Sequence, residues 1–196
     1  MALAGKTAGG IVFALIFFAT FLYQDKKVDK LIHYLCNMNY FELFELPVSL
    51  QIDKAKLAQK YFELQKKYHP DFFARGTEHE QEQALEISAR LNKALKILKD
   101  QDQTIKYVLQ LKELLEEEEK YQLPPAFLME MMELNEDLSE DSARQIQELE
   151  SQLYSEVAPI IENYDDSRAT NADLLKLKEY YYKKKYLQRI LDRLDG

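Results

Sequence analysis

The residues of this chain best suited to chemistry stand together and supply an imidazole, a ring of fixed φ and a carboxylate: His69, Pro70 and Asp71. Proline disfavours helical backbone at the residue before it, so a helix that begins at Lys54 should end at Tyr68. A second helix is expected to open near Thr77, after a turn at Gly76. Because loops held between rigid helices commonly carry function, we expect the tripeptide to form an exposed docking tip.

Other parts of the chain do not indicate catalysis. There is no glycine-rich phosphate loop, no Ser/His/Asp order and no zinc-ligand spacing. The single cysteine, Cys36, excludes an internal disulfide and a multi-cysteine zinc site. The histidines are too scattered for a metal cluster: His33, His69 and His79. We therefore expect a protein that is not an enzyme and that needs no cofactor and no metal.

The helix before the tripeptide is amphipathic and basic. Its apolar residues recur at steps of four, three and four: Leu57, Tyr61, Leu64 and Tyr68. Lysines lie beside this stripe, with one further round the helix: Lys56, Lys60, Lys67 and Lys66. Glu63 interrupts them. On a chain of formal net charge −8, a positive strip indicates steering toward an acidic partner, and a merely solvated face is the alternative.

Composition predicts an all-α fold, because the 196 residues include only five Gly and five Pro. The expected helices cover residues 39–46, 53–68, 77–99, 104–119, 125–138, 142–163 and 172–194. Leu123-Pro124-Pro125 marks the best domain boundary. Pro159 should kink its helix or end it early. The acidic run from Glu116 to Glu119 is interpreted as a solvated helix end.

The N-terminal residues 1–37 allow three interpretations. Ile11 to Tyr23 is almost wholly apolar but shorter than the ~20 residues that span a bilayer. Met38 begins what reads as a complete domain, so the extension is interpreted as a product of an over-long gene prediction, as a membrane anchor or as a signal peptide. Membrane contact is expected only through residues 7–23, with Lys26 and Lys27 on the cytoplasmic side.

The helix after the double proline has two apolar faces. One repeats with core spacing: Phe127, Met131, Leu134 and Leu138. The other is rich in methionine and edged by carboxylates: Leu128, Met129, Met132, Glu133 and Glu136. Because methionine adapts to a partner's shape, the second face is a candidate protein-binding surface. The alternative is that neighbouring helices cover both faces.

A block of tyrosines next to lysines, Tyr180 to Lys185, could suggest nucleic-acid binding. Consecutive residues spread over all faces of a helix, however. We expect the tyrosines to face the bundle or a partner and the lysines to face water, and we expect no nucleic-acid partner.

The apolar stripe, the basic face and the tripeptide between two antiparallel helices resemble the J domain of DnaJ-type co-chaperones. The resemblance implies that His69, Pro70 and Asp71 engage a DnaK-type chaperone and trigger ATP hydrolysis by that partner. It also implies that Lys60, Lys66 and Lys67 dock on an acidic surface of the chaperone. A J protein itself performs no chemistry.

Three segments resemble the HscB co-chaperones of iron–sulfur cluster assembly: Met38 to Phe44, Tyr68 to Phe73 and Ala126 to Glu130. The resemblance covers nearly all of residues 38–196. It implies a J domain over residues 38–120 and an antiparallel three-helix bundle over residues 125–196. Bacterial members usually start at the position of Met38, which places residues 1–37 in question. Some relatives carry an N-terminal cysteine zinc module, whose cysteines this chain lacks.

The same resemblance implies the partners: a chaperone of the HscA kind and the scaffold IscU, which holds a nascent iron–sulfur cluster. Apolar contacts to the scaffold would come from Leu128, Met129 and Met132, and polar ones from Glu133 and Glu136. The last helix would add an aromatic ring, one of Tyr180, Tyr181 or Tyr182, of which we select Tyr182. The implied location is the cytoplasm. A membrane-tethered J protein that recruits a DnaK-type chaperone to another client is the alternative.

Overall fold

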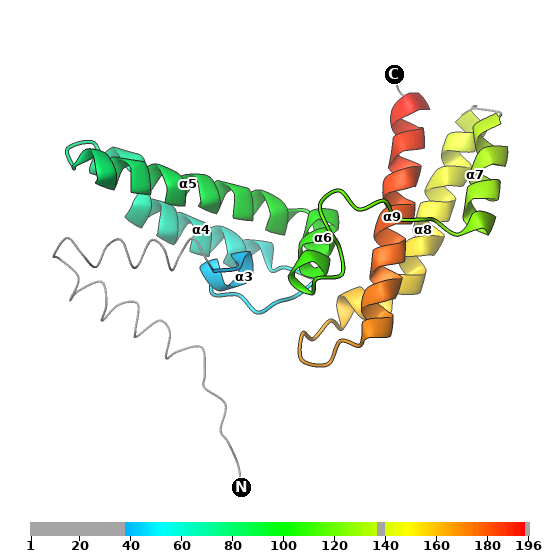
Figure 1. Ribbon diagram of the computed structural model, residues 1–196, viewed down its shortest axis with the longest axis horizontal. Helices are drawn as coiled ribbons and strands as arrows, with labels where there is room; N and C mark the ends of the chain where they lie inside the picture. The colour runs from blue at the N-terminus through cyan, green and yellow to red at the C-terminus, as the bar shows by residue number, and fades with distance from the viewer. Residues whose placement is uncertain (1–37, 137–139, 195–196) are drawn as a thin grey trace, which may run out of the picture. The chain divides into compact units, whose positions relative to one another are not determined.

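The computed structural model describes residues 38–136 and 140–194, and this part of the chain contains helices and no strands (Figure 1). The helices are α3 (Tyr40–Leu43), α4 (Lys54–Tyr68), the 3-10 helix η1 (Pro70–Phe73), α5 (Glu78–Lys99), α6 (Gln101–Leu111), α7 (Pro125–Glu136), α8 (Glu140–Glu162) and α9 (Asn171–Leu194). The all-α prediction is confirmed.

The interpretations placed on residues 1–37, including the anchor at 7–23, lie outside the described residues. Among the helices that are described, none has the length and apolar character needed to cross a bilayer.

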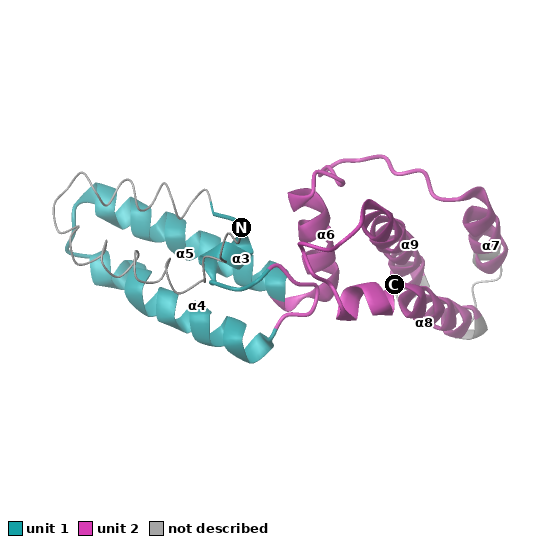
Figure 2. Ribbon diagram, turned by 90° about the horizontal axis from the view of Figure 1, so that it is seen from below, with its two compact units in different colours: residues 1–47, 53–98 teal, residues 48–52, 99–196 magenta. Residues whose placement is uncertain are grey.

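The described chain divides into two compact units (Figure 2). The first unit contains α3, α4 and α5. The second contains α6 to α9 together with the short segment Val48–Ile52. Helix α6, which the expected boundaries assign to residues 38–120, is thus grouped with the C-terminal helices and packs on α9.

In the first unit, local signals position the α4–α5 hairpin. The Asp53 carboxylate accepts the Ala55 and Lys56 N–H groups and begins α4. Thr77 and Glu80 form the expected capping box before α5. The buried apolar side chains of the first unit are Met38, Tyr40, Phe41, Leu43, Phe44, Leu57, Ala84, Ile87, Leu91, Ala94 and Leu98. Because α4 and α5 are each capped at their first turn and pack through an apolar face, they hold the ends of the loop between them in fixed positions.

Two helices are shorter than expected, and the predicted ranges 39–46 and 104–119 are wrong. Helix α3 ends at Leu43 because Glu45 adopts a left-handed conformation, with φ of 53°. Helix α6 begins after the N-cap Asp100, and Glu113, with φ of 57°, follows its end. The run from Glu116 to Glu119 is therefore not a helix end but part of a non-helical linker that continues to α7.

The second unit buries apolar side chains from α6, α7, α8 and α9: Ile105, Val108, Leu109, Phe127, Met131, Ile146, Leu153, Val157, Ile161, Leu174, Leu177, Leu187 and Ile190. Helix α8 does not end early at Pro159 but continues to Glu162. The proline carbonyl accepts a hydrogen bond from the Asn163 side-chain amide, at 2.9 Å, near the helix end. The four helices share this apolar core, which holds α7 in place.

One lysine links three helices of this unit. Lys184 Nζ of α9 lies 2.9 Å from an Asp102 oxygen of α6 and 3.3 Å from a Glu150 oxygen of α8. Burial opposes the charge on Lys184, but the hydrogen bond and the charge of Asp102 outweigh burial and raise its pKa. The folded state therefore favours the protonated lysine.

We expect Lys184→Ala to loosen α6. The substitution leaves two half-buried carboxylates without their shared cation, so the free energy of opening α6 should fall by about 1–2 kcal/mol, between the values for exposed and buried pairs. Amide hydrogen exchange of α6 measures this change. The exposed Lys176 of the same helix is the control, and equal α6 protection in Lys176→Ala and Lys184→Ala would contradict the assignment.

Candidate functional site

The His69–Asp71 loop is a tight turn. His69 ends α4 with extended backbone, at ψ of 131°, as the following proline requires. Its Nδ1 atom accepts the Asp71 N–H at 3.3 Å, and its carbonyl accepts the Phe72 N–H at 3.0 Å. Pro70 is the first residue of η1. A backbone N–H at this position has no partner within the helix, so its absence in proline costs no hydrogen bond. The predicted end of α4 at Tyr68 is confirmed.

The same turn presents its polar groups to solvent. The Asp71 side chain is 86% exposed and that of His69 46% exposed, with His69 Nδ1 3.5 Å from Asp71 Oδ2. An open carboxylate beside an imidazole can accept and donate hydrogen bonds across an interface.

The basic strip of α4 is divided. Lys66 and Lys67 are exposed. Lys60 is instead held by Glu45, with Nζ 2.5 Å from Oε2, and lies 3.7 Å from Glu63 Oε2. The hydrogen bond from Lys60 to Glu45 outweighs burial and raises the lysine pKa. Among the described residues, no carboxylate pairs with Lys66 or Lys67, so a partner would meet both cations directly, whereas Lys60 would have to leave Glu45.

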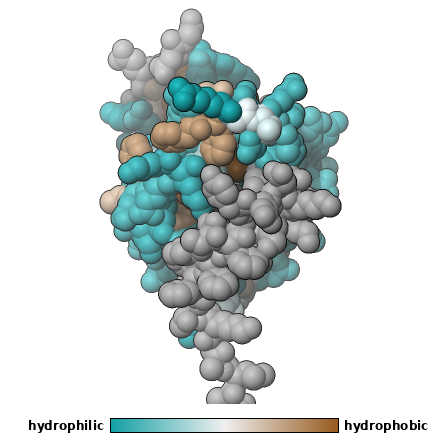
Figure 3. Space-filling model, turned by 90° about the vertical axis from the view of Figure 1, so that its left-hand side faces the viewer, coloured by the Kyte–Doolittle hydropathy of each residue, from teal (hydrophilic) through white to brown (hydrophobic). Residues whose placement is uncertain are grey.

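Sequence reasoning missed two exposed rings of the first unit. Phe62 and Phe72 are each 68% exposed. The Phe72 ring meets the His69 ring edge to face, with centroids 6.1 Å apart. Figure 3, which looks toward the loop end of the hairpin, shows apolar surface set among hydrophilic surface. Two features of the sequence could have indicated this exposure. Phe72 directly follows Asp71 in the loop, and Phe62 lies outside the apolar stripe of α4.

Helix α7 buries one apolar face and exposes the other. Phe127 and Met131 are buried, with exposed fractions of 5% and 0%. Met129 and Met132 are each 64% exposed, so the alternative that neighbouring helices cover both faces is wrong. Further members of the second face are the half-buried Leu128, the exposed Glu133, and Glu136, which lies in α7 but whose side chain is outside the described residues.

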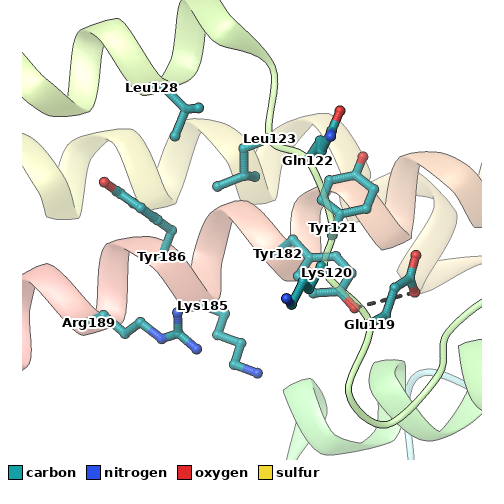
Figure 4. Close-up of a pocket in the computed structure, with 10 residues that line it drawn as sticks. All are labelled: Glu119, Lys120, Tyr121, Gln122, Leu123, Leu128, Tyr182, Lys185, Tyr186 and Arg189. Atoms are coloured by element: carbon teal, nitrogen blue, oxygen red, sulfur yellow. Dashed lines mark hydrogen bonds between the residues drawn. The ribbon is translucent and has the colours of Figure 1, made fainter.

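Leu128 and Tyr182 line one groove, of about 640 Å³, between the linker and helices α7 and α9 (Figure 4). Of the three consecutive tyrosines, Tyr180 and Tyr181 are buried and Tyr182 is half-buried. Tyr182 is therefore the member of the block that faces this groove. The structure brings an aromatic ring of α9 and an apolar side chain of α7 to one surface. That this surface contacts the scaffold stays a prediction.

The linker is held against this groove. Tyr121 stacks on Tyr182 with centroids 4.5 Å apart and an interplanar angle of 4°. The Tyr182 hydroxyl donates to Glu119 at 3.4 Å, and Lys178 Nζ lies 2.5 Å from the other Glu119 oxygen. Burial, then the Glu119 charge, raises the pKa of Tyr182 to about 12, so the hydroxyl stays a donor at neutral pH.

Comparison with known proteins agrees with this architecture. Residues 123–195 match the family model of the HSCB C-terminal oligomerisation domain. The co-chaperone protein HscB homolog of Shewanella halifaxensis is 34% identical over 170 residues, which cover 80% of this chain and 95% of that protein. The homolog of Vibrio atlanticus is 32% identical over 171 residues and is covered along 100% of its length.

The chain belongs to the HscB family.

Other HscB relatives match over less of their length. The co-chaperone protein HscB homolog of Vibrio cholerae is 39% identical over 107 residues, and the match spans 63% of that protein. Solved structures of HscB proteins are also similar to this chain. The crystal structure of human co-chaperone protein HscB aligns with a TM-score of 0.66 at 27% identity over 81% of each chain. The chaperone HscB from Vibrio cholerae aligns at 0.54 and 29% identity, over 80% of this chain and 99% of its own.

Proposed function

We propose that this protein is a co-chaperone in the maturation of iron–sulfur proteins. Its first unit stimulates ATP hydrolysis by a chaperone of the DnaK or HscA type, and its second unit delivers a scaffold of the IscU type to that chaperone. The observation that carries the proposal is that each compact unit exposes side chains suited to binding a protein: the His69–Asp71 tip on one unit and the Met129–Met132 face on the other.

The tip is suited to regulating a partner's chemistry. The Asp71 carboxylate is open to solvent, and the His69 ring holds the Asp71 backbone by accepting its N–H at 3.3 Å. Lys66 and Lys67, one turn earlier on α4, add positive charge to a protein of net charge −8. Such a strip steers the tip toward an acidic surface and speeds encounter. Pro70 limits the loop's conformations, so little order has to be imposed when the chaperone binds.

The face on α7 is suited to holding cargo. Met129 and Met132 expose flexible apolar side chains to solvent. Neighbouring exposed methionines on one helix form an apolar surface that can adapt to the shape of a partner protein. Glu133 adds a polar edge, as an interface rim requires. A scaffold bound at this face is kept at high effective concentration beside the chaperone, because both partners are held by one chain.

The proposal is tested by measuring steady-state ATP hydrolysis with the DnaK- and HscA-type chaperones of the same organism. We expect the full chain to accelerate hydrolysis, to hydrolyse no ATP alone, and to bind the IscU-type scaffold in calorimetry. If none of these chaperones were accelerated, the proposed function would be wrong. Acceleration without scaffold binding would reject the cargo part only.

A further inference from the structure

Most lysines in the middle of α9 have carboxylate partners. Lys178 is held by Glu119, Lys183 Nζ lies 2.6 Å from a Glu179 oxygen, and Lys184 is held by Asp102. The next two cations, Lys185 and Arg189, are both exposed. Neither lies within ion-pair distance of a carboxylate in the part of the chain that the structure describes. An unmatched pair of cations is notable on a chain of net charge −8.

These two cations line the same groove as Leu128 and Tyr182. Figure 4 shows Lys185 and Arg189 extending from α9 along one side, with Leu123 and Leu128 on the other and Tyr186 between them. The groove therefore has a positive side and an apolar side. Its size, about 640 Å³, corresponds to a few amino-acid side chains rather than to a whole folded surface.

The positive charges on this side of the groove repel one another in the unbound protein. Burial, then the charges of Arg189 and of Lys106 on α6, lowers the pKa of Lys185. Like charges four residues apart on one helix are destabilising. A carboxylate bound between Lys185 and Arg189 would relieve this repulsion and would gain charge-assisted hydrogen bonds.

We infer that this groove binds an acidic segment of the scaffold, with a carboxylate placed between Lys185 and Arg189 and an adjacent apolar side chain against Leu128 and Tyr186. The inference rests on the proposed function and extends its cargo surface from the α7 face to α9. A nucleic acid fits less well, because one side of the groove is apolar and two cations neutralise few phosphates.

The test is calorimetry and stopped-flow binding of the IscU-type scaffold to the double variant Lys185→Gln/Arg189→Gln. We expect the affinity for the scaffold at low salt to fall by about tenfold. Most of the loss should come from slower association, because charges at the rim of an interface mainly change the association rate. The loss should shrink as salt rises and screens the charges. The conservative double variant Lys185→Arg/Arg189→Lys should bind as the unmodified protein does.

A matched control removes one lysine and one arginine elsewhere in the same unit: Lys176→Gln/Arg168→Gln. Both residues are exposed, and Lys176 lies on the opposite side of α9 from Lys185, since a helix turns about 100° per residue. The net charge changes equally, so a general electrostatic effect would weaken both variants alike.

The outcomes separate the inference from the proposed function. Weaker binding and a flatter salt dependence in Lys185→Gln/Arg189→Gln alone support the inference. Unchanged binding and salt dependence in that variant, or equal loss in the control, overturn the inference and leave the α7 face as the cargo site. If the unmodified protein did not bind the scaffold, both would fall.

Discussion

Asp71→Asn should abolish stimulation of the chaperone's ATPase while scaffold affinity stays unchanged. The side chain is 86% exposed, so its carboxylate supports little of the fold and is available to a partner. Asparagine keeps the shape and removes the charge. Loss of a central charged contact costs about 2 kcal/mol or more, so stimulation at a fixed protein concentration should fall by more than about tenfold. Steady-state ATP hydrolysis measures it.

His69→Gln should act in the same way, because it removes the ring that lies 3.5 Å from the carboxylate. Glu82→Gln is the matched control, since Glu82 is an exposed carboxylate of α5 in the same unit. Circular dichroism verifies that all three variants keep their helices. Normal stimulation by Asp71→Asn would reject the role of the tip, whatever the behaviour of the second unit.

Leu128→Ala combined with Met132→Ala should weaken scaffold binding by more than about tenfold and leave basal ATPase stimulation intact. Met132 is 64% exposed, so its truncation removes a contact to a partner rather than a part of the core. Leu128 lines the groove that Tyr182 also faces. Isothermal calorimetry with the scaffold gives the affinity, and ATPase rates without scaffold give the stimulation.

The matched control for this pair is Leu175→Ala, because Leu175 is an apolar residue of α9 that is 51% exposed and is not among the residues that line the groove. Since Leu128 is half-buried, Met129→Ala/Met132→Ala provides a second variant that leaves the bundle untouched. If the affinity of both double variants matched that of the unmodified protein, the α7 face could not be the cargo site.

Local signals predicted much of this fold. The Asp53 cap, the Thr77–Glu80 capping box and the bend before Pro70 are set by residues within a few positions of one another. For that reason the boundaries of α4 and α5 were predictable. Failures came where the backbone turned without a glycine, as at Glu113, whose left-handed φ ends α6 in a stretch that favours helix.

Contacts between distant segments were beyond sequence reasoning. The Lys178–Glu119 and Lys184–Asp102 pairs join positions 59 and 82 residues apart. No periodicity shows that Lys60 will bind Glu45, or that Lys185 will have no carboxylate partner among the described residues. The exposure of Met129 and Met132, in contrast, could be anticipated, because a helix in a small bundle normally buries one apolar face. The partners assigned to these surfaces remain predictions.

The stack of Tyr121 on Tyr182 has a consequence for the speed and strength of capture. A linker left free would lose conformational freedom on each binding event, and that loss would weaken the complex. Here the aromatic pair and the Glu119 anchors have already immobilised the linker against α9. The linker side of the groove is thus already ordered in the unbound protein. If the scaffold binds there as we infer, the linker would lose little further conformational freedom on binding.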